Sequence, residues 1–441
     1  MSSIPDPTFS NSRRSMKIVY LTAGAAGMFC GSCMHDNTLA KAIARKGVDI
    51  ELVPTYTPIR TDENDVSVDQ VFFGGINIYL QQKVPFLRLI PKFFDRVLDN
   101  PWLIKRVTQD ATTVNLNELG RLAVSMLKGP KGNQKKEVKR LTDWLQKSSQ
   151  PDFLIFSNML IGGCIPVLKN LLKTKLVVTL QGDDIFLDSL PEKFRSQCIE
   201  EMKKIVPHVD RFITHSQYYA DYMSDFLTIP SNKISITPLG IELEDLVSET
   251  ETKKHPPTIG FLARLAPEKG LSVLVDAFIK LRERKKVPNA KLKIAGWLGS
   301  SNRQFAEMQF QKLQDANLGD DFEYLGAVNR QEKIRFLKGI DVLSVPTIYK
   351  EPKGLYVLEA LALGVPVIQP SHGAFPEIIS DTQGGILIPP NNSDELSDTL
   401  AELLLNENKR VELGKQGQQS VRSLRNSESM ATSTLEILNS L

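Results

Sequence analysis

The chain has 441 residues, of which 41% are hydrophobic and 24% are charged. This length exceeds what one hydrophobic core usually supports, so we expect two globular domains of about 200 residues each. A net charge of +3 gives no reason to expect a nucleic-acid partner, and no sequence stretch has the roughly 18 uninterrupted apolar residues of a membrane-spanning helix. Four cysteines without a disulfide framework indicate a reducing compartment, so we expect a cytoplasmic protein without disulfides.

The first half of the chain alternates short apolar stretches with amphipathic ones. Residues 1–15 are polar and rich in proline, serine and asparagine, which predicts a disordered tail. Arg13-Arg14 resembles the start of an export signal, but Lys17–Thr22 fits a first strand that enters a glycine-rich loop. Further strands are predicted at residues 49–54, 76–80, 153–156, 175–180, 211–214 and 234–237, with helices at 37–46 and 161–172. This alternation predicts a doubly wound parallel sheet in an N-terminal domain of residues 16–245.

Residues 83–147 form a basic insertion in this domain. They contain 14 lysines and arginines against six acidic residues, and Val84–Leu98 mixes bulky apolar side chains with cations, as an interfacial helix does. Two interpretations stay open. The insertion makes a peripheral contact with an anionic membrane, at its inner face, or it is a helical cap with a solvated basic face.

The pattern restarts after a polar linker at residues 242–257. Strands are predicted at 258–262, 291–295, 322–325, 341–346 and 365–369, and helices at 271–284 and 355–363, which gives a C-terminal domain of residues 258–425. Residues 426–441 are helical in character, and we expect them to pack back on the N-terminal domain. Two such domains in tandem usually hold a ligand between the carboxyl ends of their sheets.

Two glutamates separated by seven residues stand out in the C-terminal domain. Glu351 follows a predicted strand, and Glu359 falls just over one turn into the next helix, so their carboxylates can bracket a ligand at the helix N-terminus. Gly354 permits close backbone approach there, and the first helix amides favour an anion such as phosphate. Such glutamate pairs are common on solvated surfaces, and only the strand-loop-helix context favours a site.

Arg264 and Lys269 form a second constellation in the loop after the strand at 258–262. Two cations five residues apart, just before a helix, can converge on a diphosphate. Alone this pair more often marks an exposed loop. Because the loop that carries Glu351 is expected at the same sheet edge, the two loops together predict a nucleotide site.

These motifs resemble the family-4 class of retaining glycosyltransferases, which have the GT-B fold. The resemblance rests on Arg264…Lys269-Gly270, Ala295-Gly296, Glu351-x7-Glu359-Ala360, Gly364-Val-Pro-Val-Ile368, Gly373-x-x-Pro376-Glu377-Ile378 and Gly384-Gly385-Ile-Leu-Ile-Pro389. The N-terminal half is similar only in its pattern, through Gly24-Ala-Ala-Gly27 and Thr237-Pro-Leu-Gly-Ile-Glu242. The resemblance implies an α/β protein of two Rossmann-like, doubly wound parallel-sheet domains that face each other across a cleft.

The resemblance also implies an activity: a sugar moves from a nucleotide-diphosphate sugar to an acceptor hydroxyl with retention of anomeric configuration. No metal or other cofactor is implied, because the leaving phosphate can receive the acceptor's proton. Arg264 and Lys269 would hold the diphosphate, Glu351 would contact the donor sugar, and Glu359 would accept hydrogen bonds from the ribose. The other donor-side residues implied are Gly354, Leu355 and Tyr356 through their amides, Gly24 and Gly27 in the first loop, and Val328 near the base.

The acceptor side departs from the family pattern. Members often carry a histidine where this chain has Asn158, and their His-Gly-x-Asp stretch is here Gln181-Gly-Asp183-Asp184. Asn158, Gln181 and Asp183 could still bind hydroxyls of a carbohydrate or lipid-linked acceptor. His35 is the one histidine of the N-terminal domain that we expect near the acceptor, whereas His215 is expected to cap or pack.

Other chemistries are less well supported. Cys30-Gly-Ser-Cys33 could be half a zinc site or a redox dithiol, but no second pair is present, so we expect ordinary thiols. An epimerase or sugar-phosphate synthase of the same fold stays open, as does a non-catalytic sugar-nucleotide-binding protein. An NAD dehydrogenase is disfavoured because Gly24-x-x-Gly27 is not a full G-x-G-x-x-G motif.

Overall fold

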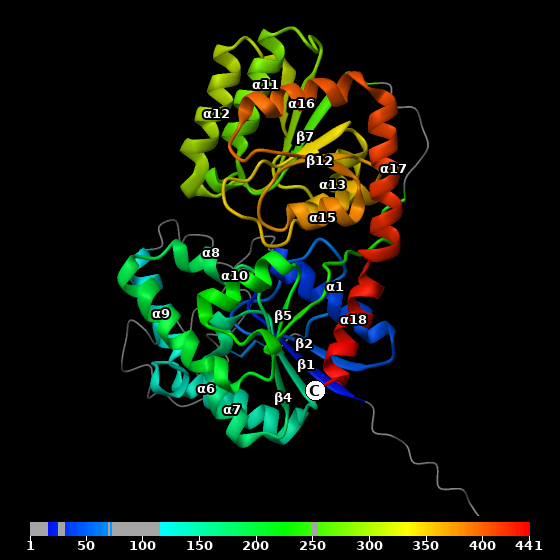
Figure 1. Ribbon diagram of the computed structural model, residues 1–441. Coiled ribbons are helices and arrows are strands. Elements are labelled where there is room, and N and C mark those ends of the chain that lie inside the picture. Colours follow the sequence, from blue (N-terminus) through cyan, green and yellow to red (C-terminus); the bar gives the residue numbers. More distant parts are fainter. Residues whose placement is uncertain (1–15, 25–30, 69–70, 73–114, 248–254) are drawn as a thin grey trace, which may run out of the picture.

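The computed structural model of the chain describes residues 16–24, 31–68, 71–72, 115–247 and 255–441. The expected tail at 1–15, the strand at 76–80, residues 83–114 of the basic insertion, Gly27 and Cys30 lie outside these ranges. Two six-stranded parallel sheets, each flanked by helices, make up the described residues (Figure 1). We call the part up to residue 247 the N-terminal half and the part from residue 255 the C-terminal half.

The N-terminal sheet has the strand order β2-β1-β3-β4-β5-β6, and every neighbouring pair is parallel. Alternate residues of β1 enter different cores: Ile18 and Tyr20 pack on one face, and Val19 and Leu21 on the other. Both faces are therefore buried, as expected for a parallel sheet. The strands are β1 (Lys17–Thr22), β2 (Asp49–Pro54), β3 (Phe153–Phe156), β4 (Lys175–Thr179), β5 (Arg211–Thr214) and β6 (Ile234–Ile236).

The helices of this half differ from the sequence prediction at two points. The first helix begins at Gly31 rather than residue 37, because its first turns carry buried polar residues that hide the apolar period. The helix predicted at 161–172 is a 3-10 helix (η4, Met159–Cys164) followed by α7, which starts with a proline at its second position. The helices are α1 (Gly31–Arg45), α5 (Leu116–Leu127), α6 (Lys135–Trp144), α7 (Ile165–Leu171), α8 (Asp183–Asp188), α9 (Glu192–Ile205) and α10 (Gln217–Leu227).

The C-terminal sheet has the order β12-β11-β10-β7-β8-β9, again with parallel pairs. Its strands are β7 (Thr258–Leu262), β8 (Lys291–Ala295), β9 (Phe322–Tyr324), β10 (Val342–Ser344), β11 (Val367–Pro370) and β12 (Gly385–Ile388). β10 is shorter than the strand predicted at 341–346, and β11 begins two residues later than the strand predicted at 365–369. The reason is that Pro346 and Pro366 lack the amide hydrogen that a strand ladder needs. The helices are α11 (Leu271–Glu283), α12 (Arg303–Asp315), α13 (Arg330–Lys338), α14 (Leu355–Ala362), α15 (Phe375–Thr382), α16 (Ser393–Leu405), α17 (Glu407–Leu424) and α18 (Ser427–Asn439).

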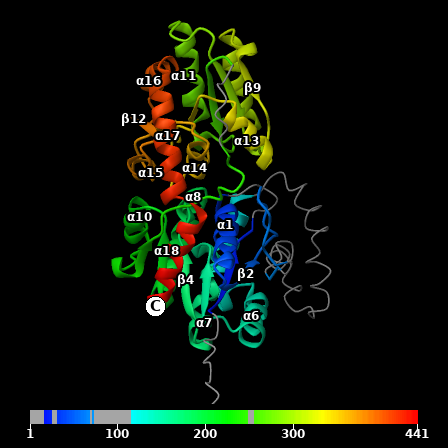
Figure 2. The same cartoon turned by 90° about the vertical axis from the view of Figure 1, so that its right-hand side faces the viewer.

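The chain end connects the two halves. Helix α17 runs along the C-terminal half, and α18 lies against α1 beside the N-terminal sheet (Figures 1 and 2). An isolated bridge between Ile241 and Asn426 fixes the crossing point, where Ser427 donates its amide to the Ile241 carbonyl at 2.8 Å.

A second contact between the halves involves a helix N-terminus. The Glu377 carboxylate of α15 accepts hydrogen bonds from the backbone amides of Gln217 and Tyr218, both at 2.7 Å. These are the first two amides of α10, so the carboxylate also meets the positive end of that helix dipole.

Gly270 brings two loops of the C-terminal sheet together. It has a φ of +76°, and a Cβ at this position would lie 1.8 Å from the carbonyl oxygen of Pro346. Only glycine fits this contact, which places the loop after β7 against the loop after β10.

We predict that Gly270→Ala destabilises the protein more than Gly47→Ala. Gly47 has a similar φ of +79° but nothing within 4 Å of its Cβ position, so alanine there costs only the left-handed strain of roughly 1–2 kcal/mol. Gly270→Ala adds overpacking of about 1–3 kcal/mol. Urea denaturation of the two variants measures the difference, and equal losses would show that the loop contact is not tight.

Candidate functional site

The loops after β7 and β10 bring Lys269 and Glu351 into contact. The Lys269 ammonium donates to Glu351 Oε2 at 2.8 Å and also to the Tyr349 hydroxyl. It lies 4.8 Å from the centre of the Tyr349 ring and 5.8 Å from that of Tyr356. Two residues that are 82 positions apart in sequence thus form one charged pair at the carboxyl edge of the C-terminal sheet.

Glu351 is a buried carboxylate, with 5% of its surface exposed. Burial alone would raise the pKa of its carboxyl, but the Lys269 ammonium and the Tyr349 hydroxyl outweigh that effect, and the pKa lies below its ordinary value. Glu351 is therefore charged at neutral pH.

Arg264 is near enough to this pair for its charge to act on the Tyr349 hydroxyl. Its guanidinium donates to Glu268 at 2.6 Å, and its side chain is 43% exposed. An exposed ion pair of this kind contributes little to stability, so a ligand can recruit Arg264 at small cost.

The first turn of α14 is open to an anion. Gly354 is its N-cap residue in the left-handed conformation, with a φ of +74°, and no side chain among the described residues caps the helix. Leu355 and Tyr356 are the first two residues of this helix, so their backbone amides lie at its N-terminus, beside Glu351. Its positive dipole end therefore faces the Lys269–Glu351 pair.

Glu359, one turn further along α14, belongs to a buried ion-pair cluster. Its carboxylate contacts Lys333 and lies 3.6 Å from Arg330, both on α13. Lys333 also pairs with Asp62 of the N-terminal half at 2.5 Å. Burial lowers the pKa of Lys333, but Glu359 and Asp62 outweigh burial, so the net shift is upward and the ammonium stays charged.

Arg330 extends the cluster to the linker. Its guanidinium binds both carboxylate oxygens of Asp245, at 2.7 and 2.9 Å, and lies 3.8 Å from Glu63. A single ion-pair cluster therefore joins the two halves, and it consists of Asp62, Glu63, Asp245, Arg330, Lys333 and Glu359. Glu359 is the residue that the family resemblance implies for ribose binding.

The remaining donor-side positions that the structure describes lie in two loops. Gly24, after β1, has a φ of +86°, and a Cβ there would lie 2.1 Å from the Thr57 carbonyl oxygen, so glycine is required. Val328 lies between β9 and α13 and packs against the core that α14 shares. Gly27 is outside the described residues.

Of the acceptor-side candidates, only Gln181 reaches the other half. Its side-chain amide donates to Asp36 at 2.8 Å and to the Ser157 carbonyl at 3.0 Å, while its oxygen accepts from Lys353 at 3.1 Å. Asn158 instead caps η4 by accepting from the Ile161 amide at 3.2 Å.

The Asp183 carboxylate also stabilises a loop of the N-terminal half. It accepts from the amides of Met159 at 2.6 Å and Gln181 at 3.2 Å, and burial raises its pKa to about 6. Asn158 and Asp183 therefore hold the loops that follow β3 and β4 of the N-terminal half.

His35 is buried against His215, with ring centres 4.4 Å apart. Its Nδ1 lies 3.1 Å from Asp36 Oδ1, and His215 Nδ1 lies 3.0 Å from the Thr237 carbonyl oxygen. Burial lowers the pKa of both imidazoles, so both rings are neutral at pH 7. His215 thus packs, as expected, although it packs on His35.

Two residues of the site were not identified from the sequence. Asp36 accepts from the hydroxyls of Tyr20 at 2.6 Å and Thr22 at 2.7 Å as well as from Gln181. Lys353 lies between Glu351 and Gly354, inside the glutamate motif, and no role was predicted for it. The only sequence signal for Asp36 was the polar start of α1, and for Lys353 the presence of a cation inside the glutamate motif.

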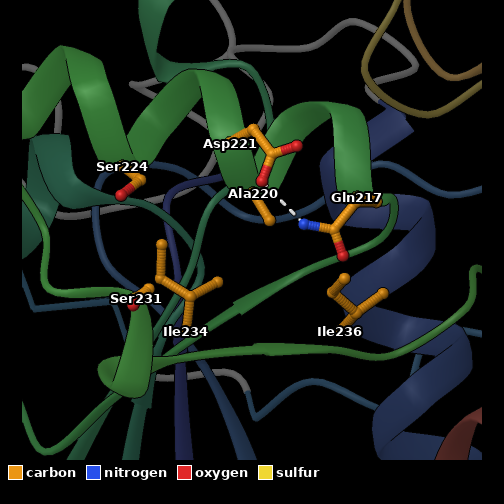
Figure 3. Close-up of a pocket in the computed structure, with 7 residues that line it drawn as sticks. All are labelled: Gln217, Ala220, Asp221, Ser224, Ser231, Ile234 and Ile236. Atoms are coloured by element: carbon orange, nitrogen blue, oxygen red, sulfur yellow. Dashed lines mark hydrogen bonds between the residues drawn. The ribbon is translucent and has the colours of Figure 1, made fainter.

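Three other features bear on the sequence expectations. The described residues contain no group of three or more His, Cys, Asp and Glu side chains placed to hold a metal ion, and Cys33, Cys164 and Cys198 are buried. No helix among them is long and apolar enough to cross a bilayer. A small pocket lies between α10 and β6 (Figure 3), lined by Gln217, Ala220, Asp221, Ser224, Ser231, Ile234 and Ile236, none of which the sequence singled out.

The fold is similar to that of solved glycosyltransferase-type structures. Sucrose-phosphate synthase from Thermosynechococcus elongatus matches with a TM-score of 0.70 and 17% identity over 96% of this chain and 98% of that one. HepE of Anabaena, solved with UDP and glucose, matches with a TM-score of 0.67 and 15% identity over 97% and 100%. At these identities the likeness shows the GT-B fold alone.

Curated relatives match over shorter stretches. A D-inositol 3-phosphate glycosyltransferase from Corynebacterium efficiens is 31% identical over 182 residues, 41% of each protein. A GDP-mannose-dependent phosphatidylinositol monomannoside mannosyltransferase from Mycobacterium tuberculosis is 28% identical over 207 residues, 44% of this chain and 52% of the relative. The chain spans about half the length of the curated relatives it matches.

Two family models match consecutive parts of the chain. Residues 35–245 match the model for Glycosyltransferase Family 4, and residues 244–420 match the model for glycosyl transferases group 1. The second range contains Lys269, Glu351 and Glu359, and the first contains Gln181. From these matches and the GT-B fold, the chain belongs to the family-4 glycosyltransferases.

Proposed function

We propose that the chain transfers a sugar from a nucleotide-diphosphate sugar to an acceptor hydroxyl, with retention of anomeric configuration and without a metal or other cofactor. The observation that carries the proposal is the Lys269–Glu351 pair beside the uncapped N-terminus of α14. A diphosphate placed there meets an ammonium ion, a recruitable guanidinium and free helix amides together.

These groups would supply the electrostatic part of catalysis. As the bond between the sugar and the diphosphate breaks, negative charge grows on the leaving diphosphate, where Lys269, Arg264 and the amides of Leu355 and Tyr356 stabilise it. The same groups provide the charge compensation that a divalent cation would otherwise give. The acceptor oxygen bonds to the anomeric carbon on the face from which the diphosphate leaves, and an oxygen of the leaving phosphate takes the proton of the acceptor hydroxyl, so neither a protein nucleophile nor a protein base is required.

Glu351 and Glu359 would act on the sugar and the ribose. The charged Glu351 carboxylate accepts hydrogen bonds from sugar hydroxyls and balances positive charge at the anomeric carbon. Lys269 then exchanges Glu351 for the diphosphate, because a hydrogen bond from its ammonium to a phosphate oxygen is charge-assisted as well. Glu359, oriented by Lys333 and Arg330, has a second oxygen for the ribose hydroxyls.

The named ligands of similar proteins support the donor class. HepE was solved with UDP and glucose, and the mycobacterial relative is named for GDP-mannose. The acceptors in the relatives' names, inositol phosphate and a phosphatidylinositol mannoside, support a carbohydrate or lipid-linked acceptor on the Gln181 side.

For a lipid-linked acceptor, we propose that the basic insertion meets an anionic membrane from the cytoplasmic side. In its described part, Lys135 and Lys139 of α6 are exposed. Neutralising both should weaken co-sedimentation with vesicles that contain anionic lipid, and unchanged sedimentation would refute this contact.

A sugar-phosphate synthase is the second candidate, because sucrose-phosphate synthase shares the fold over almost the whole chain. It would use a small phosphorylated acceptor. An epimerase would turn over the donor with no acceptor at all, and a non-catalytic binding protein would bind it without turnover. The presence of turnover, the need for an acceptor and the kind of acceptor used therefore separate the four functions.

We predict that one of UDP, GDP or ADP raises the melting temperature of the wild type but not of Arg264→Ala. At about 100 times its dissociation constant, a ligand adds roughly 2.7 kcal/mol to the free energy of unfolding. Arg284→Ala is the matched control: this arginine directly follows α11, is 39% exposed and pairs with Asp394 at 2.6 Å. A wild type that responds to no nucleotide would contradict the proposed donor class.

We also predict a pH-dependent defect in Lys269→Met. In wild type the pKa of the Glu351 carboxyl lies below its unfolded value. Without the Lys269 ammonium the effect of burial dominates, and the pKa rises above the unfolded value. A raised acid pKa stabilises the fold below the unfolded pKa, and this contribution is lost as pH rises through the folded pKa. The stability deficit relative to wild type should therefore grow between about pH 5 and pH 8, toward about 3–5 kcal/mol.

Thermal unfolding across this pH range measures the deficit. The double variant with Lys269→Met and Glu351→Gln is the control, because it removes the titrating carboxyl and should show a flat deficit. A deficit in the single variant that stays constant with pH would mean that Lys269 does not set the charge of Glu351.

A further inference from the structure

Four carboxylates surround Arg330 and Lys333 in the ion-pair cluster that joins the halves, and two of them are fully engaged. Asp245 places both of its oxygens on the Arg330 guanidinium, at 2.7 and 2.9 Å. Glu63 accepts from the Thr38 hydroxyl at 3.1 Å through one oxygen, and its other oxygen lies 3.8 Å from Arg330. A ligand would therefore compete with an existing partner at either of these two carboxylates.

The other two carboxylates of the cluster each use a single oxygen. Glu359 meets both Lys333 and Arg330 through its Oε1. Asp62 meets the same Lys333 ammonium through its Oδ2, at 2.5 Å. The Oδ1 atom of Asp62 is buried and has no hydrogen-bond partner among the described residues. Such an oxygen is costly, because a carboxylate only accepts hydrogen bonds and burial has removed those that it makes with water.

Asp62 and Glu359 lie at one place although they come from different halves. Asp62 follows β2 of the N-terminal sheet, and Glu359 lies on α14. Both carboxylates contact the same nitrogen atom of Lys333, so they are no more than two hydrogen-bond lengths apart. Their side chains are 4% and 6% exposed. A hydrogen-bond donor that enters between the halves and reaches Glu359 therefore also reaches Asp62.

A ribose ring supplies the hydrogen-bond donors that these two carboxylates lack. Its 2′- and 3′-hydroxyls lie on neighbouring carbons, and each can donate one hydrogen bond, so that one ring can serve two carboxylates. Acidic side chains are common partners of ribose hydroxyls in nucleotide-binding α/β folds. Lys333 keeps its contacts with Glu359 Oε1 and Asp62 Oδ2 in such a complex, so the pairs that join the halves stay intact.

We propose that Asp62 accepts a hydrogen bond from one ribose hydroxyl of the donor nucleotide, next to the hydroxyl that Glu359 binds. The proposal rests on the proposed function, which places the ribose at Glu359. It adds a carboxylate of the N-terminal half to the donor site, where this half otherwise contributes only the glycines of its first loop. The nucleotide then bridges the halves, and its binding favours the state in which they are in contact.

The test removes each partner of the proposed hydrogen bond separately and together. Calorimetry first measures the binding of UDP, GDP and ADP, and then that of the 2′-deoxy and 3′-deoxy forms of the nucleotide that binds most tightly. The proteins are wild type, Asp62→Ala, Asp62→Asn and Asp65→Asn. The last is the matched control, because Asp65 is an exposed residue of the same loop and accepts the Ser67 amide at 2.8 Å, a contact that asparagine keeps.

The proposal predicts that wild type and Asp65→Asn lose affinity on the order of tenfold when the hydroxyl that meets Asp62 is removed from the nucleotide. Asp62→Ala binds the complete nucleotide no more tightly than this deoxy form, because the accepting oxygen is already gone. Removal of the other hydroxyl weakens Asp62→Ala as much as wild type. Asp62→Asn, which keeps an oxygen for Lys333 and so guards against a loss of folding, retains only part of the preference.

Two results overturn this role of Asp62 while leaving the proposed function intact. In the first, wild type binds a nucleotide but removal of either ribose hydroxyl has no effect. In the second, both Asp62 variants weaken the complete and the deoxy nucleotides equally, which would mean that Asp62 only holds the halves together. Failure of wild type to bind UDP, GDP or ADP overturns both the proposed function and the role of Asp62.

Discussion

Charges buried between the two sheets must be paired, and the arrangement of the molecule depends on that requirement. A buried ion left without its partner costs several kcal/mol, on the order of 3–5. Lys333 meets this requirement by pairing with Glu359 of its own half and Asp62 of the other, while Arg330 ties the same cluster to Asp245 in the linker. The halves are therefore joined where the carboxyl edges of the sheets meet.

This constraint shapes the candidate site. The two glutamates of the C-terminal motif are held by different cations: Lys269 faces Glu351, and Lys333 faces Glu359. A diphosphate competes for Lys269, which is paired with a single carboxylate, whereas Lys333 is shared by two. The donor can thus loosen the first pair while the second continues to hold the halves together. Lys353 links the two halves directly, since its ammonium donates to Ser32 and Gln181 of the N-terminal half.

Most strands could be predicted from the sequence, because a parallel strand buried on both faces is an apolar run with clear limits. The runs at 17–22, 49–54, 258–262 and 291–295 have the predicted bounds. The start of α1 was missed because Asp36 and its neighbours are buried polar residues without an apolar period. The side-chain contacts between the halves could not be predicted: Lys353 and Gln181 are 172 positions apart, and nothing local in either indicates the other. The motif showed which loops matter, but not that Glu359 is already paired.

The most direct test of the account uses sugars that carry the nucleotide that the protein binds. Each is incubated with the protein, with and without an acceptor, and the anomeric proton is followed by NMR. The account predicts a new glycoside that forms only with the acceptor, in the absence of added metal, and has the same anomeric configuration as the donor. An inverted product, or an epimerised donor formed without acceptor, would contradict it.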